Sequence, residues 1–386
     1  SCNFSQDTEE LIARFNRQAE GFRLVSKNYY NEKNYQGGSD QLKADLLSGI
    51  VPDILFLTEL DYQSLSNKGL FEDMRPWMEN DSDFHSEDYM MNFLESMTYK
   101  GRMERIAFQF AAEGYMAKTE FLDGHTSLTA QDVLSLDLPE GMCFLYDTWG
   151  RDEMFSGICH SQLGSFVDYA NASCSFDSPE FMSLLELVNT VSDGQTASDD
   201  YGYQEDRILL YDSNLFCLTD YHFAREVVFS GEDVTLTGLT CSEGNGGMVY
   251  PLNALAVSAV SAHKEEAWEF IKFCMQAENS GGNTLFSVNR AALEQSMTEE
   301  MQRDVKRSKW SHSMDDISVE VSVPTQAEAD ELMAYLEGIT VCTFSDSKIT
   351  AIVQEEAGKY FAGDQTVEAC AASIQNRVSI YLAEQM

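Results

Sequence analysis

The apolar residues of this chain change repeatedly from helical spacing to short strand-like runs. Leu11 and Phe15 lie about one helical turn apart, which predicts a first helix. Residues 23–30 alternate in polarity and are predicted to form a strand. A second helix should end at Gly49, before an apolar run over residues 54–57. The order helix, strand, helix, strand predicts an α/β fold.

The stretch LLSGIVPDILFLTELDYQSL combines a helix end, a turn, a buried strand and a polar loop. Gly49 suits the left-handed position after a helix because it has no Cβ. The continuous apolar run at residues 54–57 is expected of a parallel strand that helices cover on both faces. Ligands of open α/β sheets bind at the carboxyl ends of strands, so the residues that follow are candidate binding residues: Glu59, Asp61 and Tyr62.

Similar patterns continue over the rest of the chain. Strands are predicted at residues 104–112, 142–146, 215–219 and 248–258. Helices are predicted at residues 62–68, 206–211, 221–229 and 264–277, after the capping residues Thr129, Ser178 and Thr366, and over most of the chain from residue 328. Residues 193–203 show no periodicity and are expected to form a loop.

The charge balance narrows the class of partner. The chain has 386 residues and a formal net charge of -39, and 44% of its residues are hydrophobic. Single cores stop growing near ~250–300 residues, so we expect two lobes. A surface this acidic repels phosphate backbones and anionic lipid, which argues against nucleic-acid and membrane-surface binding. It favours neutral or cationic small-molecule ligands.

Metal, disulfide and membrane signals are weak. The nine cysteines form no C-x-x-C pair and are interpreted as small buried hydrophobes in preference to a disulfide framework. The six histidines lack ligand spacing, and the acidic residues 79–89 lack the glycine and terminal glutamate of a calcium loop, so we expect no metal and no cofactor. No apolar run approaches the length of a membrane span.

Catalytic motifs are also missing. The sequence contains no G-x-S-x-G, no phosphate-binding loop, no H-E-x-x-H and no G-x-G-x-x-G after a strand. A carboxylate pair for glycoside hydrolysis stays open, but with 64 acidic residues any chosen pair is uninformative. The sequence therefore provides no specific catalytic motif.

Aromatic and polar residues near the ends of predicted elements remain as binding candidates. Carbohydrate sites use this mixture, because aromatic faces stack on sugar C–H surfaces while carboxylates and amides bind hydroxyls. For any single one of these residues a structural role is the alternative interpretation. The candidates are Tyr35, Gln36, Glu59, Asp61, Tyr62, Gln109, Phe110, Trp149, Tyr221, Tyr250 and Trp310.

Several segments together resemble a known family. IARFNRQAEGFRLVSKNY, GGSDQLKADLLSGIVPDILFL and DYQSLSNKGLFEDMRPWME in the first part, and PLNALAVSAVSAHKEEAWEFIKF and EEAGKYFAGDQTVEACAASIQNRVSIYL later, resemble extracellular solute-binding proteins of sugar-type ABC transporters, the group of maltose-binding protein. The segments FDSPEF and YFAGDQT are similar to those of Firmicutes-type surface proteins. The resemblance is spread over nearly the whole chain.

The resemblance implies an α/β, two-lobe periplasmic-binding-protein-like clamp of type II, with the ligand cleft between lobes joined by three crossings. Lobe 1 would comprise residues 1–110 and 251–312, and lobe 2 residues 111–250 and 313–386. The crossings would lie near residues 109–112, 248–251 and 310–316. Closure of the lobes around the ligand would be the signal read by a membrane permease.

The function implied is that of a monomeric binding protein, not an enzyme, which captures a sugar or oligosaccharide outside the cell for an ABC importer. A binder of peptides or cationic small molecules is the alternative, followed by a surface glycan-processing enzyme or sensor. The family is usually lipid-anchored at a first cysteine, so Cys2 is an anchor candidate, and the chain could instead belong to a longer membrane-attached protein. Residues 103–105 and 128–129 depart from the family pattern, which puts any specific sugar in doubt.

Overall fold

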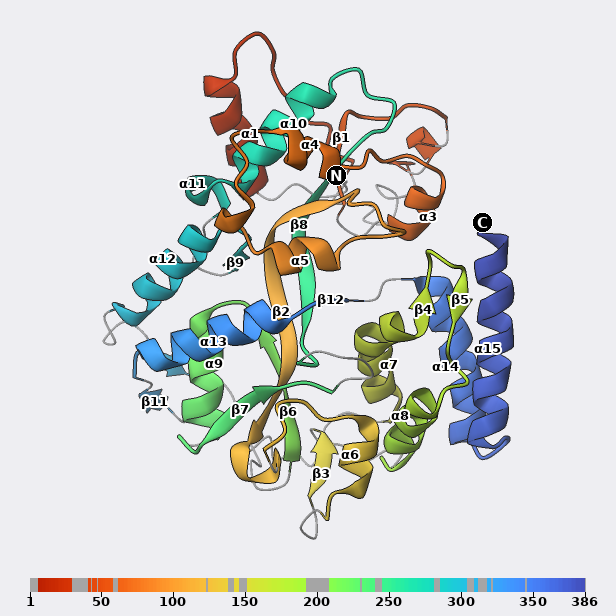
Figure 1. Ribbon diagram of the computed structural model, residues 1–386. Coiled ribbons are helices and arrows are strands. Elements are labelled where there is room, and N and C mark those ends of the chain that lie inside the picture. The colour runs from red at the N-terminus through yellow and green to blue at the C-terminus, as the bar shows by residue number, and fades with distance from the viewer. Residues whose placement is uncertain are drawn as a thin grey trace. The chain divides into compact units, whose positions relative to one another are not determined.

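Figure 1 shows the computed structural model of the chain. It describes residues 6–29, 41, 42, 44–46, 48–57, 62–122, 124–137, 142–145, 151–191, 208–229, 231–239, 245–280, 285–303, 309–311, 318–320, 322–343 and 346–385. The chain divides into two compact units. Unit 1 comprises Ser1–Phe110 and Pro251–Gln295, and unit 2 comprises Ala111–Tyr250 and Ser296–Met386.

Unit 1 combines short helices with antiparallel strand pairs. Its helices are α1 (Gln6–Gln18), α3 (Tyr62–Asn67), α4 (Arg75–Asn80), η1 (Ser86–Asp88), α5 (Met91–Ser96), α10 (Lys264–Met275), α11 (Ala277–Ser280) and the first part of α12 (Arg290–Met301). In this unit β1 (Ile54–Phe56) pairs with β8 (Met248–Val257), and β9 (Phe286–Ser287) pairs with β2 (Ile106–Lys118). The Phe15 ring centroid on α1 lies 5.2 Å from those of both Phe270 and Phe273, so α1 packs against α10.

Unit 2 is built on a mixed sheet. β6 (Ile208–Leu215) lies between β2, which is antiparallel to it, and β3 (Cys143–Leu145), which is parallel to it. β7 (Val234–Thr237) pairs antiparallel with β2, and β12 (Val341–Cys342) pairs parallel with β8. Two small antiparallel sheets are formed by β4 (Val167–Asp168) with β5 (Ser173–Cys174) and by β10 (Lys309–Ser311) with β11 (Ser318–Glu320).

The helices of unit 2 pack around this sheet. They are η2 (Thr119–Leu122), α6 (Ala130–Ser135), α7 (Arg151–Gln162), η3 (Leu163–Phe166), α8 (Pro179–Asn189), α9 (Leu218–Phe223), the π-helical turn η5 (Ala224–Val228), α13 (Gln326–Gly338), α14 (Ser347–Phe361) and α15 (Val367–Glu384), together with the end of α12. In Figure 1, α7, α8, α14 and α15 form one group, and α9 and α13 form another.

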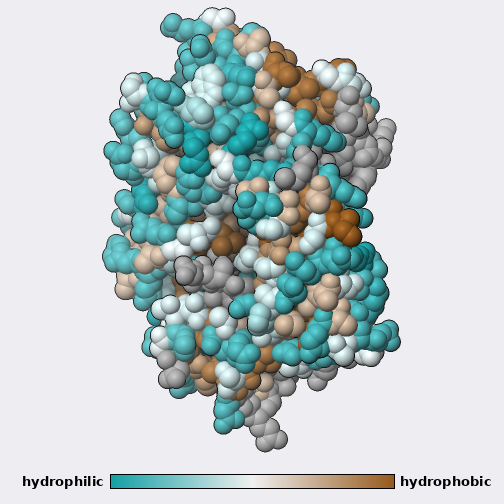
Figure 2. Space-filling model, turned by 45° about the vertical axis from the view of Figure 1, so that its right-hand side comes forward, coloured by the Kyte–Doolittle hydropathy of each residue, from teal (hydrophilic) through white to brown (hydrophobic). Residues whose placement is uncertain are grey.

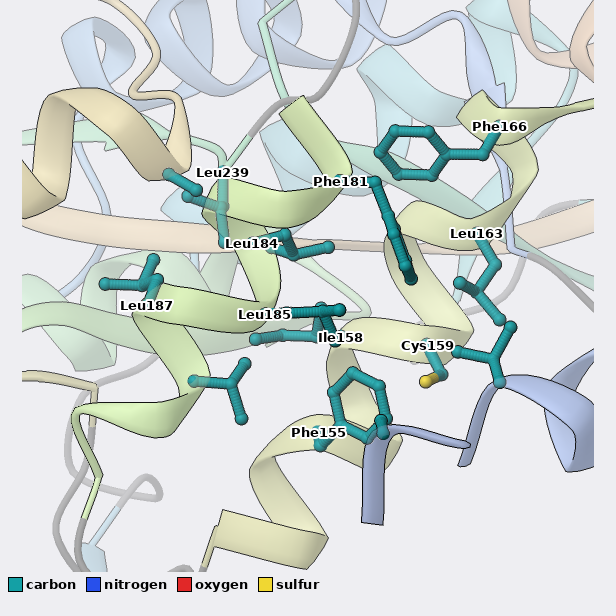
Figure 3. Packing of buried hydrophobic residues seen from close by; sticks show 14 of the residues in the cluster. Phe155, Ile158, Cys159, Leu163, Phe166, Phe181, Leu184, Leu185, Leu187 and Leu239 are labelled. Carbon is teal, nitrogen blue, oxygen red and sulfur yellow. The ribbon is translucent and has the colours of Figure 1, made fainter. Parts of the chain in front are cut away.

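A hydrophobic core of unit 2 lies where α7, η3 and α8 meet (Figure 3). The Phe181 ring of α8 makes edge-to-face contacts with Phe166, at 5.1 Å between centroids, and with Phe176, at 5.0 Å. Ile158 of α7 and Leu184 of α8 are almost fully buried beside them. Burying side chains of this size stabilises the unit by roughly 1.5–3 kcal/mol for each one.

The end of the second helix confirms the prediction at Gly49. Residues 41, 42 and 44–46 are helical, and Gly49 has a φ of +80°. Its N–H donates to the Leu46 carbonyl, and the Ile50 N–H donates to the Asp45 carbonyl at 2.9 Å. These two bonds are those of a Schellman motif, which requires a left-handed residue at this position.

The predicted capping residues are confirmed as well. Thr129, Ser178 and Thr366 each accept a hydrogen bond from the backbone N–H three residues later, at the starts of α6, α8 and α15. The predicted strands at residues 104–112, 142–146 and 248–258 correspond to β2, β3 and β8. The predicted helices at residues 62–68 and 264–277 correspond to α3 and α10.

The predicted strand at residues 23–30 is wrong over its described part. Residues 22–29 belong to no helix or strand, and most of their side chains are exposed. Lys27 and Tyr29 each donate a hydrogen bond to Asp45 Oδ2 at 2.8 Å. Hydrogen bonds from side chains to one carboxylate thus hold this segment, instead of backbone pairing with a neighbouring strand.

The predicted parallel pairing of the strand at residues 54–57 is also wrong. The strand exists as β1, and Leu55 is buried as expected. However, its partner in the described part of the chain is β8, which runs antiparallel to it and places Leu55 opposite Ala256. A continuous apolar run indicates burial on both faces, and burial does not by itself determine strand direction.

The predicted helix at residues 206–211 and the predicted strand at residues 215–219 are both wrong where the structure describes them. Residues 208–215 form β6, and α9 begins at Leu218. Leu209 and Leu210 are both fully buried, since neighbouring strands flank β6 and helices cover the sheet. A strand covered in this way has apolar side chains on both faces, and such a run resembles a helix in sequence.

The acidic residues 79–89 form the end of α4, turns and η1. They are not only a solvated loop, because Asp81 Oδ2 accepts hydrogen bonds from Trp268 Nε1, at 2.8 Å, and from Lys272 Nζ, at 2.6 Å. Trp268 is 5% exposed and lies in the core of unit 1. Asp81 therefore joins this acidic segment to α10.

The hydrophilic surface and the buried cysteines agree with the expectations from composition. Hydrophilic residues cover most of the face shown in Figure 2, with hydrophobic residues in small groups between them. Cys159, Cys274 and Cys370 are free thiols that are fully buried. Cys2, Cys241 and residues 193–203 lie outside the described residues. None of the described helices is both long and apolar enough to cross a membrane.

Candidate functional site

Polar side chains gather on one face of the β2–β6 pair in unit 2. The register places Tyr115 opposite Asp212 and Glu113 opposite Asn214. Side chains alternate between the faces of a strand, so all four residues share one face, named here the acidic face. Diagonal neighbours such as Glu113 and Asp212 lie roughly 7–8 Å apart in an antiparallel pair. Glu113 is half-buried, whereas Asp212 and Asn214 are exposed.

Tyr335 of α13 covers the other face of these strands. A Cβ at Gly114 would lie 1.8 Å from Tyr335 Oη, and a Cβ at Gly247 would lie 2.3 Å from it. The same hydroxyl lies within hydrogen-bonding distance of the carbonyl oxygens of Glu113, at 3.4 Å, and of Thr237, at 3.2 Å. Because Gly114 faces α13, the side chain of Glu113 is directed to the opposite, acidic face.

The carboxylates of the acidic face hold their protons more tightly than usual. Burial raises the pKa of Glu113. Burial, together with the nearby charge of Glu113, raises the pKa of Asp212 to about 6. Water screens part of this effect at Asp212, because the residue is exposed. Among the described residues, no cation or hydrogen-bond donor contacts either carboxylate.

Tyr115 adds a hydroxyl to the acidic face. The residue is 8% exposed, and its ring belongs to the core of unit 2. Burial, with smaller contributions from the charges of Asp212 and Glu113, raises the pKa of Tyr115, so the hydroxyl stays protonated. Within the described part of the chain this hydroxyl has no hydrogen-bond partner. Two carboxylates and one available hydroxyl are thus close together at the acidic face.

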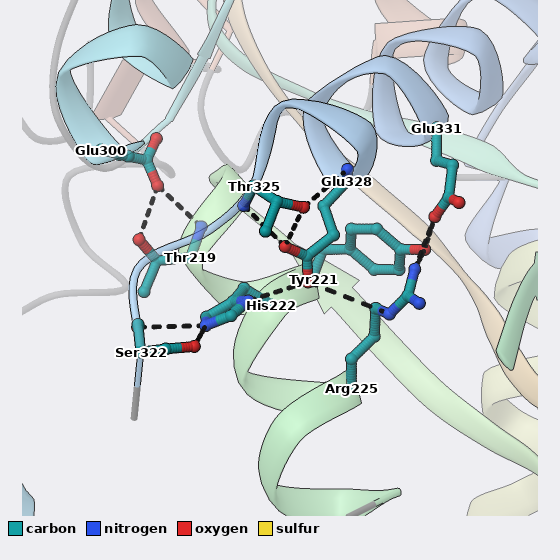
Figure 4. Close-up of polar contacts among 9 residues, drawn as sticks. All are labelled: Thr219, Tyr221, His222, Arg225, Glu300, Ser322, Thr325, Glu328 and Glu331. Atoms are coloured by element: carbon teal, nitrogen blue, oxygen red, sulfur yellow. Dashed lines mark hydrogen bonds and ion pairs between the residues drawn. The ribbon is translucent and has the colours of Figure 1, made fainter. Parts of the chain in front are cut away.

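The candidate Tyr221 lies in a polar network between α9 and α13 (Figure 4). It is 1% exposed, and its hydroxyl donates to Glu331 Oε2 at 2.6 Å and accepts from Arg225 at 3.0 Å. Arg225 also contacts Glu331 directly, at 2.6 Å. Burial is the main cause of the raised pKa of Tyr221. In this structure the ring has almost no surface for a ligand to contact.

His222 and Glu328 are also buried in this network, with 2% and 6% exposure. His222 Nδ1 lies 2.8 Å from Glu328 Oε1, and Nε2 lies 3.0 Å from the Ser322 carbonyl. Burial alone would lower the pKa of His222, but the bond to Glu328 and its charge produce a net rise. Burial opposes ionisation of Glu328, yet the bonds from His222 and Thr325 lower its pKa to about 2.

Tyr62 is buried in unit 1, with 2% exposure. Its hydroxyl donates to Glu104 Oε2 at 3.4 Å, and the Arg105 guanidinium lies 4.5 Å from the centre of its ring. Glu104 also accepts a hydrogen bond from Ser66 and pairs with Arg102 at 2.6 Å. In this structure Tyr62 therefore organises a buried polar cluster.

Gln109 and Phe110 follow each other on β2 but differ in their surroundings. Gln109 is half-buried, accepts a hydrogen bond from Asn253 at 2.7 Å and donates to the Ser280 carbonyl at 3.1 Å. Phe110 is 1% exposed, and its ring centroid lies 4.5 Å from that of Phe93. Packing within unit 1 thus accounts for Phe110.

Tyr250 is 41% exposed on β8, and its ring centroid lies 6.1 Å from that of His160 on α7. It is the candidate aromatic residue with the most available surface among those described. Trp310 belongs to β10, where it is paired with Val319. The remaining candidates lie outside the described residues: Tyr35, Gln36, Glu59, Asp61 and Trp149. All eleven assignments as ligand contacts stay predictions.

Sequence reasoning missed Glu113 and Asp212. The predicted strand ended at residue 112, one residue before Glu113, and Asp212 lay between a predicted helix and a predicted strand. The spacing of Asp212 and Asn214 was a usable signal, because residues two positions apart lie on the same face of a strand. In the described residues no group of three or more His, Cys, Asp or Glu side chains could hold a metal ion.

Comparison with solved structures identifies the fold. The sugar-binding protein MalE from Xanthomonas citri matches with a TM-score of 0.61 and 15% identity, over 98% of this chain and 96% of that one. An ABC transporter solute-binding protein from Thermotoga lettingae, bound with alpha-D-tagatose, matches with a TM-score of 0.55 and 13% identity over the same shares. An ABC substrate-binding protein from Listeria monocytogenes, in complex with cycloalternan, also matches with a TM-score of 0.55 and 13% identity, over 98% of this chain and 96% of that one.

No protein-family model matches the chain, and no curated protein matches its sequence. The similarity to solved structures covers nearly the whole chain on both sides. The chain therefore has the α/β fold of periplasmic-binding-protein-like sugar-binding proteins, at low sequence identity.

Proposed function

We propose that this protein is the extracytoplasmic substrate-binding component of an ABC importer and that it captures a sugar or oligosaccharide. The observation that carries this proposal is the fold. The structural match covers 98% of this chain and 96% of each of two solute-binding proteins, one bound with alpha-D-tagatose and one in complex with cycloalternan. The partners would be the carbohydrate and a membrane permease, and the location would be the outside of the cell.

Ligand capture is proposed to occur by closure of two lobes that three chain crossings connect. The division into two compact units supports this, since each unit is assembled from two separate stretches of chain. β2 and β8 both contain residues of each unit. We propose the third crossing near residues 310–316. By its contacts, the chain passes from unit 1 to unit 2 after Gln295.

A thermal-shift screen tests the ligand class. Monosaccharides, oligosaccharides, polyamines and short peptides are added separately at millimolar concentration, and the melting temperature is recorded. A ligand that binds only the folded state stabilises it by about 2.7 kcal/mol at a hundred times its dissociation constant. We expect at least one carbohydrate to raise the melting temperature. A response to peptides or polyamines alone would contradict the carbohydrate proposal.

A cationic ligand is the second candidate, and a specific observation favours it. The net charge is -39, and the acidic face presents two carboxylates that no cation contacts within the described residues. Charge complementarity would raise the local concentration of a cation and the rate of its association. Binding of a cation should weaken as salt increases, whereas binding of a neutral sugar should change little.

Small-angle X-ray scattering tests the closure. Scattering curves are recorded with and without a saturating concentration of a ligand found in the screen. Lobe closure predicts a smaller radius of gyration with ligand. The matched control is a sugar that gave no thermal shift, which should leave the radius unchanged. An unchanged radius at saturation with the true ligand would exclude the clamp.

A further inference from the structure

We propose that Glu113, Asp212 and Tyr115 form a subsite for a protonated primary amine of the ligand. This inference rests on the proposed function and narrows it, because it identifies the ligand as an amine-bearing molecule such as an amino sugar. All three residues belong to β2 and β6 in unit 2, and the strand register places them on one face.

In the described residues, the carboxylates of the acidic face lack the partner groups found at other carboxylates of unit 2. Other buried carboxylates of unit 2 have partners: Glu356 contacts Lys359 at 2.8 Å, and Glu300 accepts a hydrogen bond from the Thr219 hydroxyl at 2.7 Å. Glu113 and Asp212 have none in the described chain. Two like charges on one strand face repel each other, so a cation placed between them would remove an unfavourable interaction.

Tyr115 brings a hydroxyl group to the same face. Its side chain is more than nine-tenths buried, it lies across from Asp212, and its oxygen has no partner among the described residues. The hydroxyl is not one of the fully enclosed polar atoms that lack a partner, so it stays accessible to a donor group of a ligand. An ammonium group has three donors, so it can bond to one oxygen from each of these three residues.

A neutral sugar fits these groups less well than an amine. Sugar hydroxyls can donate to carboxylates, but they leave both negative charges uncompensated in a partly desolvated place. A protonated amine supplies the donors and the charge together, and charge-assisted hydrogen bonds are about twice as strong as neutral ones. Tyr335, packed against the opposite face, supplies only a protonated hydroxyl and no cation.

Isothermal titration calorimetry with matched ligands tests the subsite. The probes are glucosamine and the chitosan disaccharide, their uncharged counterparts glucose and N-acetylglucosamine, spermidine and calcium chloride. We expect the amine-bearing probes to bind at least tenfold more tightly than the uncharged ones at pH 7. Equal affinities for glucosamine and glucose would overturn the subsite and leave the carbohydrate proposal intact.

The other outcomes separate the two proposals. Spermidine binding without any sugar binding would support the amine subsite and overturn carbohydrate capture. Binding of calcium in preference to every amine would overturn the amine subsite. Absence of binding by all probes would count against both proposals.

Three variants assign the effect to these residues. Glu113→Gln and Asp212→Asn should each weaken amine binding roughly tenfold or more, and Tyr115→Phe should weaken it less. Asp330→Asn is the matched control, because it removes an exposed carboxylate on α13 that bonds to Gln326. Far-UV circular dichroism and the melting temperature verify folding. Unchanged amine affinity in folded Glu113→Gln and Asp212→Asn would overturn the subsite.

The pH dependence gives an independent measurement. Asp212 must be ionised to attract the amine, while Glu113 and Tyr115 are the titratable groups against it. Amine affinity should therefore rise between pH 5 and pH 7 in the wild type. Asp212→Asn should flatten this rise, and Asp330→Asn should retain it. A wild-type affinity independent of pH in this range would contradict the assignment.

Discussion

At the scale of single residues, the His222–Glu328 pair makes the stability of unit 2 depend on pH in two directions. Glu328 has a folded pKa of about 2, so its stabilisation is present above about pH 4.5 and is lost as pH falls toward 2. The pKa of His222 is raised in the folded state, so its stabilisation is present below about pH 6.5 and is lost as pH rises. We expect the pair to contribute most between about pH 5 and 6.

Urea unfolding between pH 4 and pH 8 measures this contribution. Glu328→Gln should lower the free energy of unfolding of unit 2 by roughly 3 kcal/mol near pH 5.5, because it leaves a buried imidazolium without its carboxylate. The difference from wild type should shrink as pH rises above 7. Asp330→Asn, which changes an exposed carboxylate of the same helix, should follow the wild-type profile. A constant difference across all pH values would refute the ionic contribution.

Gly114 is required for steric reasons, because a Cβ there would lie 1.8 Å from Tyr335 Oη. Gly114→Ala should lower the free energy of unfolding by about 1–3 kcal/mol, the usual cost of overpacking. Gly358→Ala is the control, since Gly358 is an exposed residue of α14 with open space around it, and should stabilise by roughly 0.5–1 kcal/mol. Adding Tyr335→Phe to Gly114→Ala should recover part of the loss in chemical denaturation.

At the scale of elements, the start of α6 depends on a reciprocal capping box. Thr129 Oγ1 accepts from the Asp132 N–H at 3.1 Å, and Asp132 Oδ2 accepts from the Thr129 N–H at 2.8 Å. Thr129→Ala should therefore lower the free energy of unfolding by about 1 kcal/mol, while Thr129→Ser should stay close to wild type. Equal losses for both variants in urea titrations would show that the hydroxyl is not responsible.

Sequence patterns predicted helix ends better than strand partners. Gly49 and Thr129 act through chemistry within a few residues, so their roles could be read locally. The antiparallel partner of β1 lies about 200 residues away, and nothing in an apolar run specifies strand direction. β6 was mistaken for a helix because helices and neighbouring strands bury its run of Ile208 to Leu210 on both faces.

The candidate site was also hard to predict, because its residues come together from distant parts of the sequence. A position such as Tyr221 looks like a binding residue in sequence because it is aromatic and near an element boundary. The structure places it 1% exposed, with its hydroxyl bonded to Glu331. Glu113 and Asp212 become neighbours only through the register of two strands that are about 100 residues apart. Their juxtaposition is a tertiary property that one sequence does not display.

At the scale of the whole molecule, the net charge of -39 opposes compactness. Self-repulsion of this kind destabilises the folded state and is reduced by salt, whose screening length falls to about 10 Å at 0.1 M. We expect the melting temperature to rise as sodium chloride increases from 10 to 300 mM in differential scanning calorimetry. Sodium chloride and potassium chloride should act equally. A melting temperature that falls with salt would show that ion pairs outweigh the repulsion.

The buried thiols allow the two units to be followed separately. Cys274 lies in unit 1, Cys159 and Cys370 lie in unit 2, and all three are fully buried with raised pKa values. An alkylating reagent can modify them only when the surrounding structure opens. Mass spectrometry of peptides after timed alkylation should then give one opening rate for each unit. A ligand that binds unit 2 alone should slow the alkylation of Cys159 and Cys370 and leave the alkylation rate of Cys274 unchanged.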